Sequence, residues 1–258
     1  MEHLRRAAHA GSWYTNNARK LEEELDGWLG AAGLTKSPDV RAVIAPHAGY
    51  SYSGRCAAYA FGNIDPTNIS RVFLLGPSHH YYTPKCALTR ATVYCTPIGD
   101  LPVDQEVIEE LYATGKFEYM DLSVDEAEHS MEMHLPYLAK VFQGHTVKVV
   151  PILVGALSFQ NEAMYGQLLS KYVDDPTNFF SVSSDFCHWG SRCGRVLPRN
   201  RKAPYVFIFH TAAVTSLIRC LGIKVRCNNS SRENPLNIEI HLLLVRASIK
   251  VHSFELLV

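Results

Sequence analysis

Three apolar runs along the chain end in small or turn-forming residues and then a histidine. They read AVIAPH over residues 42–47, VFLLGPSH over 72–79 and FFSVSSDFCH over 179–188. Short continuous apolar runs are typical of buried strands in a parallel sheet. Because open α/β sheets bind ligands at the carboxyl ends of their strands, we expect His47, His79 and His188 to lie near one another.

Between these runs, apolar residues recur with helical spacing. Leu21, Leu25, Trp28 and Leu29 predict an amphipathic helix over residues 15–31, which Gly30 and Gly33 close. The other predicted helices cover residues 53–63, 104–114 and 161–173, and the predicted strands cover 41–46, 71–76, 86–95, 147–154 and 179–184. Pro151 places its strand at a sheet edge or a bulge. Strands that alternate with helices predict a layered α/β domain.

Length and composition are those of an ordinary globular protein. The chain has 258 residues, of which 47% are hydrophobic, enough for one large domain or two small ones. Its 7 cysteines are scattered without a CxxC pair, and the first residues lack the apolar region of a signal peptide. We therefore expect free thiols in the cytoplasm, with the nucleus as an additional compartment.

Charge is distributed unevenly, although the formal net charge is +0. Residues 191–258 carry 11 Lys and Arg against 3 Asp and Glu, and no Asp follows Asp185. Such asymmetry can mark a basic tail, but its arginines follow no helical stripe and no nucleic-acid motif occurs. Residues 205–218 are too short and too polar for a membrane helix. We expect neither a nucleic-acid partner nor stable membrane insertion.

Two histidines at strand ends are candidate metal ligands. Neutral imidazole is the commonest metal ligand, and His47 and His79 would be held rigidly by their strands. An open catalytic centre needs a third ligand, usually Asp, Glu, His or Cys. Spacing alone also allows two hydrogen-bonded core histidines beside turns.

A third strand end carries a candidate acid–base pair, His188 with Asp185. The spacing of three residues lets the carboxylate orient the imidazole, the usual general acid or base. The alternative is a structural cap, in which Ser184 or Asp185 bonds the turn after the strand.

The stretch 125–141 is dense in polar groups. On a helix His129 and Glu132 share a face, and His134 lies off it unless Leu135 and Pro136 end the helix. Glu132 could accept a hydrogen bond from a ligating histidine. An exposed polar turn explains the stretch equally well. The other candidates for the same pocket are His80, Tyr50 and Trp13, and the two aromatic residues are also explained as core.

Six motifs resemble the Memo family in sequence and in order. They are HAGSWY (9–14), APHAGY (45–50), LGPSHH (75–80), EHSMEMHLPY (128–137), PILVG (151–155) and SSDFCHWG (183–190). The match covers residues 7–190. It implies an open central mixed sheet with helices on both faces, as in the class III non-haem iron dioxygenases that open catechol rings.

By that resemblance, His47 and His79 correspond to metal ligands and His188 to the acid–base histidine of the dioxygenases. Asp185, His129, Glu132 and His134 would line or support the same pocket. The family's pocket is associated with an iron or copper ion and with phosphotyrosine peptides. Family members are described as adaptors in growth-factor-driven migration that act on cytoskeletal regulators.

After Gly190 the resemblance stops. We therefore divide the chain into a C-terminally incomplete Memo-like domain, 1–190, and a divergent basic tail, 191–258, from alternative splicing or a frameshift. The alternative is a lineage-specific extension with its own packing. The family's third metal ligand is a cysteine in a later segment, and we do not transfer that role to Cys193, because it lies only five residues past His188. We expect a weakened metal site and a marginally stable product.

The leading hypothesis is a Memo-like signalling adaptor with a metal pocket at the strand ends. One alternative is a dioxygenase-type oxidoreductase, which oxygen uptake with catechols would reveal and which we do not expect, because the ligand set lacks an obvious carboxylate beyond Asp185. The other is a non-functional truncated isoform. No GxSxG elbow, P-loop or GxGxxG loop supports a serine hydrolase or a phosphate-cradling function.

Overall fold

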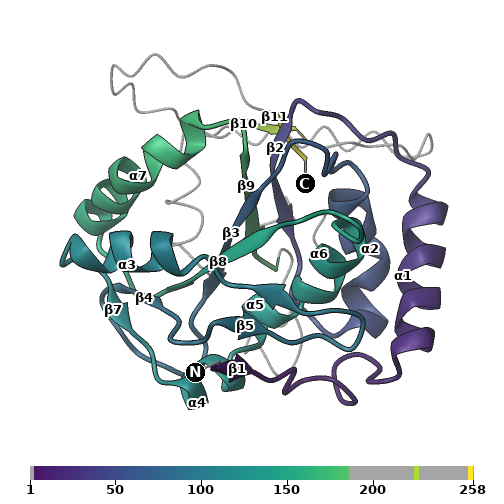
Figure 1. The fold of residues 1–258 in the computed structure, drawn as a ribbon, viewed down its shortest axis with the longest axis horizontal. Helices are drawn as coiled ribbons and strands as arrows, with labels where there is room; N and C mark the ends of the chain where they lie inside the picture. The colour runs from purple at the N-terminus through teal and green to yellow at the C-terminus, as the bar shows by residue number, and fades with distance from the viewer. Residues whose placement is uncertain (1–2, 186–223, 227–254, 258) are drawn as a thin grey trace, which may run out of the picture.

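A central sheet of eight strands organises the computed structural model, which describes residues 3–185, 224–226 and 255–257 (Figure 1). The strand order is β10-β11-β2-β9-β3-β8-β4-β7, and the ladders are parallel except the one between β4 and β8. The strands are Val40–Ala45 (β2), Arg71–Pro77 (β3), Cys86–Leu88 (β4), Glu118–Tyr119 (β7), Lys148–Val154 (β8), Asn178–Ser183 (β9), Lys224–Arg226 (β10) and Glu255–Leu257 (β11).

Helices lie on both sides of this sheet. Figure 1 shows α3 (Gln105–Ala113) and α7 (Phe159–Asp174) on one side, and α1 (Ala18–Ala32), α2 (Tyr50–Phe61) and α6 (Leu135–Val141) on the other. The short helices α4 (Leu122–Ala127) and α5 (His129–Glu132) precede α6, and a second small sheet joins β1 (Leu4–Arg5), β5 (Val93–Tyr94) and β6 (Leu101–Pro102). The predicted mixed α/β architecture is confirmed.

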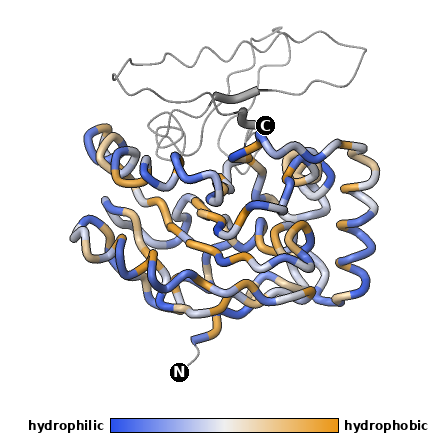
Figure 2. The backbone as a smooth tube through the Cα atoms, turned by 45° about the horizontal axis from the view of Figure 1, so that its top comes forward, coloured by the Kyte–Doolittle hydropathy of each residue, from blue (hydrophilic) through white to orange (hydrophobic). Residues whose placement is uncertain are grey.

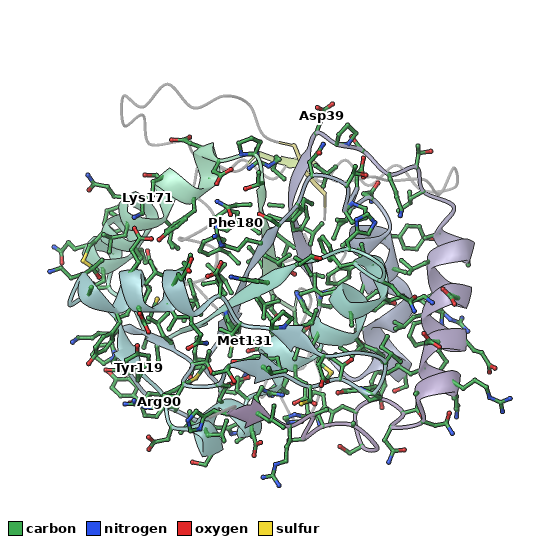
Figure 3. The ribbon with its side chains drawn as sticks, in the orientation of Figure 1. Asp39, Arg90, Tyr119, Met131, Lys171 and Phe180 are labelled. Atoms are coloured by element: carbon green, nitrogen blue, oxygen red, sulfur yellow. The ribbon has the colours of Figure 1, made fainter. Side chains whose placement is uncertain are left out.

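Apolar residues decide which strands are central. All six residues of β9 are buried, as are six of the seven in β3, because helices cover both faces. In Figure 3 the labelled core residues Met131 and Phe180 lie among the inner elements, whereas Lys171 lies at the rim. In Figure 2 the hydrophobic colour follows the inner strands, and α1 at the right is largely hydrophilic.

The first helix follows from its sequence. Asn17 caps it by accepting the Lys20 amide hydrogen, and Gly33 ends it in the left-handed conformation at φ 61°. Leu21 and Leu25 are buried. Gly30 lies inside the helix, so the end is at Gly33 alone.

Two strand predictions were wrong in detail. The predicted strand 86–95 is two strands in different sheets, because the chain turns after β4, where Thr89 donates to the buried Asp125 carboxylate. Pro151 lies in an interior strand without a bulge, since β8 has β3 on one side and β4 on the other. The ladder with β4 stops at Leu88 and Ile152, so the missing Pro151 amide hydrogen removes no bond of that ladder.

Two short segments after residue 190 extend the sheet beyond β2. β11 pairs with β2 and β10 with β11, both in parallel. The predicted strand around residues 236–242 and the boundary at residue 190 lie outside the described residues, so both stay predictions. Within the described part of the chain, no helix has the length and apolar character needed to cross a bilayer.

Candidate metal centre

The carboxyl ends of three neighbouring parallel strands meet at the candidate site. β9 lies between β2 and β3 in the sheet, so the segments that follow these strands converge at one edge. His47 comes two residues after β2, His79 two residues after β3, and Asp185 two residues after β9. The rings of His47 and His79 have their centroids 5.2 Å apart.

A third imidazole completes the cluster. His129 begins α5, which packs against β3, and its ring stacks on that of His79 at 4.2 Å and lies 5.5 Å from that of His47. One ring nitrogen from each of His47, His79 and His129 lies within 4.8 Å of the other two. We call these three residues the histidine trio.

Neighbouring side chains fix the ring orientations of two members. Ser183 Oγ donates to the backbone oxygen of Ser130 at 2.7 Å, and it therefore accepts the hydrogen of His47 Nδ1 at 2.7 Å. The Glu128 carboxylate accepts from His79 Nδ1 at 2.8 Å. In a neutral ring each Nε2 then carries the lone pair, which is the arrangement of metal-ligating histidines.

Electrostatics favour neutral imidazoles in this cluster. Burial lowers the pKa of His47 to about 3, although Asp185 opposes the shift, and burial with the neighbouring His79 lowers the pKa of His129 to about 4. Burial acts to raise the pKa of Glu128, but hydrogen bonds from His79 and Ser130 outweigh it and hold the value at about 2. At neutral pH the rings of His47 and His129 are therefore neutral and able to bind a metal, and the Glu128 carboxylate beside them is charged.

Comparison with known proteins assigns the chain to a family. The family described as Memo-like protein matches residues 5–231. The chain belongs to the Memo-like family. It is 55% identical over 190 residues to Protein MEMO1 of Xenopus tropicalis and 53% identical to that of Homo sapiens, and each alignment covers 73% of this chain. It is 49% identical over 191 residues, 74% of this chain, to Protein memo-1 homolog of Caenorhabditis elegans.

The length of these relatives sets a limit on what the match means. The chain spans 64% of the Xenopus and human proteins and 54% of the nematode one. Family membership confirms the resemblance that the six motifs carry. Any activity or partner taken from the full-length relatives is a proposal for this Memo-like chain.

Glu132 supports a histidine other than those in the trio. Its carboxylate accepts from His9 Nδ1 at 2.8 Å, from Arg5 at 2.7 Å and from the Tyr14 hydroxyl at 3.0 Å. His9 lies beside the trio, with its ring 6.0 Å from that of His129. The sequence interpretation offered Glu132 as an acceptor for a ligating histidine, and the structure gives it His9 instead.

Of the other residues predicted for this Memo-like pocket, His134 and Tyr50 are engaged in hydrogen bonds, whereas Trp13 and His80 lie near His129. Both ring nitrogens of His134 are engaged, with Ser181 Oγ at 2.8 Å and the Ala45 oxygen at 3.1 Å, and Tyr50 donates to the Met133 oxygen. Trp13 stacks on His129 with centroids 4.4 Å apart. The exposed His80 lies 6.2 Å from His129, ring to ring.

Of the candidate acid–base pair, only Asp185 lies among the described residues. Asp185 accepts the His47 amide hydrogen at 2.7 Å and lies 3.7 Å from His47 Nε2. His188 and Cys193 lie outside the described residues, so the pairing of His188 with Asp185 stays a prediction.

Three supporting residues were missed by the sequence interpretation: Glu128, Ser183 and His9. Glu128 directly precedes His129 and His9 opens the HAGSWY motif, so each stands in a quoted motif. Their partners, His79 and Glu132, are distant in sequence, and only the folded chain shows the pairing.

Proposed function

We propose that this Memo-like chain is a signalling adaptor in growth-factor-driven cell migration and cytoskeletal regulation, with an iron or copper ion held by His47, His79 and His129. Membership of the Memo-like family supports the adaptor role. The observation that carries the metal site is the histidine trio, whose ring nitrogens lie within 4.8 Å of one another.

The chemistry of the trio fits these metals. Imidazole nitrogens suit iron and copper, and the hydrogen bonds at Nδ1 of His47 and His79 leave Nε2 of each ring for an ion. A bound ion would supply Lewis-acid or one-electron redox chemistry. This trio does not depend on the family's later cysteine, which is why we include His129 in the ligand set.

A phosphotyrosine peptide is the partner that we propose for the pocket. Phosphate oxygens bind open positions on metal ions, and an aromatic ring can pack on the indole of Trp13, which is 36% exposed beside His129. Cytoskeletal regulators would then be recruited by the complex rather than by the pocket itself.

One set of variants tests both the metal site and the phosphotyrosine site. Wild type, His79→Ala and the exposed control His145→Ala are purified without oxygen and compared for bound metal and for binding of a tyrosine peptide with and without phosphate. We expect wild type and control to hold iron or copper and to prefer the phosphorylated peptide, and His79→Ala to lose both properties. A folded wild-type protein that takes up neither metal would refute the metal site. Equal binding of both peptides would refute the pocket as a phosphotyrosine site.

A further inference from the structure

The third imidazole of the trio is held differently from the other two. His47 bonds to Ser183 and His79 to Glu128 through Nδ1. Among the residues that the structure describes, no hydrogen bond reaches the His129 ring, whose Nδ1 lies 3.6 Å from the Glu128 carboxylate. Its position as a ligand must therefore come from packing.

Two ring faces enclose His129. The His79 ring is stacked on it at 4.2 Å with an interplanar angle of 30°, and the Trp13 indole lies at 4.4 Å with an angle of 34°. Close ring contacts of this kind are favourable for aromatic pairs. Since His79 is itself a candidate ligand, Trp13 makes the shortest described ring contact from outside the trio, while the rings of His9 and His80 lie at 6.0 and 6.2 Å.

The chain around Trp13 is fixed by hydrogen bonds and close packing. The Trp13 oxygen accepts the Tyr50 amide hydrogen at 2.9 Å, and the Trp13 amide donates to the His9 oxygen at 2.9 Å. The His9 ring meets the indole edge-on at 5.6 Å. A Cβ on Gly49 would lie 3.4 Å from the Trp13 oxygen, so the two segments approach closely.

A buried ion pair anchors the same segment to α5. Glu132, at the end of α5, accepts from both the amide and Nδ1 of His9 at 2.8 Å, and Arg5 pairs with it at 2.7 Å. Both partners of this pair have fully buried side chains. Residues 5–14 therefore form an arm that is bound to the helix carrying His129.

Core packing alone is a poor explanation for Trp13. Its side chain remains 36% exposed, whereas the aromatic residues Tyr14 and Tyr50 next to it are buried. An indole that is left partly in water but laid on an imidazole is better explained by that contact.

We propose that Trp13 is the positioning residue for His129, and that the arm formed by residues 5–14 sets whether the centre binds its ion through three imidazoles or two. This inference rests on the metal site proposed above. The arm would thus contribute to metal affinity, and this contribution is separate from any contact of Trp13 with a peptide.

The test compares Trp13→Leu with Trp13→Phe, which keeps an aromatic face, and with Trp28→Leu. Trp28 packs edge-on against Tyr50 at 5.8 Å and contacts no histidine ring among the described aromatic pairs, so it controls for the loss of an indole. Each metal-free protein is titrated with Cu²⁺, and the nitrogens bound to copper are counted from the hyperfine pattern in electron paramagnetic resonance. The count concerns only copper-loaded, folded protein, so it does not depend on stability.

We expect three nitrogens for wild type, Trp28→Leu and Trp13→Phe. Trp13→Leu should show two, with copper affinity lower by about three- to tenfold, the value of one aromatic pair. Three nitrogens and unchanged affinity in Trp13→Leu would overturn the positioning role while leaving the metal site intact. Absence of copper binding in wild type would instead overturn the site itself, and this inference with it.

Discussion

At the scale of single residues, the site depends on groups that fix ring nitrogens rather than on the imidazoles alone. Glu128 accepts from both the amide and the Nδ1 of His79, at 2.7 and 2.8 Å. It also caps α5 by accepting the Ser130 amide hydrogen. One carboxylate thus orients one candidate ligand and begins the helix that carries another.

Replacement of Glu128 by Gln should weaken metal binding more than it weakens the fold. The amide keeps the size of the side chain but loses the charge that orients His79, and changes of this kind cost about 10–100-fold in metal affinity. Competition with a chelator measures the loss. Glu23→Gln is the control, since Glu23 pairs with Arg19 on the exposed face of α1. Equal affinities in the two variants would contradict the role of Glu128.

The sequence brought together those residues whose position follows from the ends of the strands. His47 and His79 could be predicted because each follows an apolar run that ends in turn residues. His129 could be placed in the pocket but not in the trio, because its distance to His79 depends on how α5 packs on β3. Hydrogen bonds between distant segments, such as those of Glu128 and His9, leave no periodic pattern in the sequence.

At the scale of elements, the long strands and helices were predictable, and their pairing was not. Apolar runs gave β2, β3, β8 and β9 within a residue or two. The split of the predicted strand 86–95 could not be seen, because it depends on Asp125, which binds Thr89 from a helix further along the chain. Pro151 was assigned to an edge because the register of β4 against β8 is a tertiary property.

Gly76 lets α5 approach the end of β3, and Gly76→Ala should force the two apart. A Cβ there would lie 2.6 Å from Ser130 Oγ and 2.8 Å from Met131 Cγ, both in α5. We expect a loss of about 1–3 kcal/mol in the free energy of unfolding, and weaker metal binding because His129 moves with α5. Urea unfolding and a metal titration measure both effects.

Gly27→Ala is the matched control for this prediction. Gly27 lies within α1, and an added Cβ there meets nothing within 4 Å. Alanine should therefore stabilise the protein by about 0.5–1 kcal/mol through its helix propensity. A shift of stability in the same direction for Gly76→Ala and Gly27→Ala would contradict the close approach of α5 to β3.

At the scale of the whole molecule, burial of ionisable groups links stability to pH. Arg5, Asp125 and Glu132 form a buried network that joins the N-terminal segment to α4 and α5, and breaking such a network is costly. Buried imidazoles add a second contribution. His134 is fully buried between Ser181 and the Ala45 oxygen, and burial lowers its pKa to about 4.

The His134 contribution should be lost on acidification. Its pKa is lowered from 6.5 in the unfolded chain to about 4 in the folded one, so the unfolded state binds the proton first and stability falls between those values. At pH 5 the loss relative to pH 7 is about 2 kcal/mol for this residue. His134→Gln can keep a donor and an acceptor but cannot titrate. The fall in its free energy of unfolding from pH 7 to pH 5 should therefore be about 2 kcal/mol smaller than that of wild type. The exposed control His145→Gln should follow wild type in urea unfolding at both pH values. If His134→Gln has the same pH dependence as wild type, His134 is not the neutral buried ring that links the strand ends to α6.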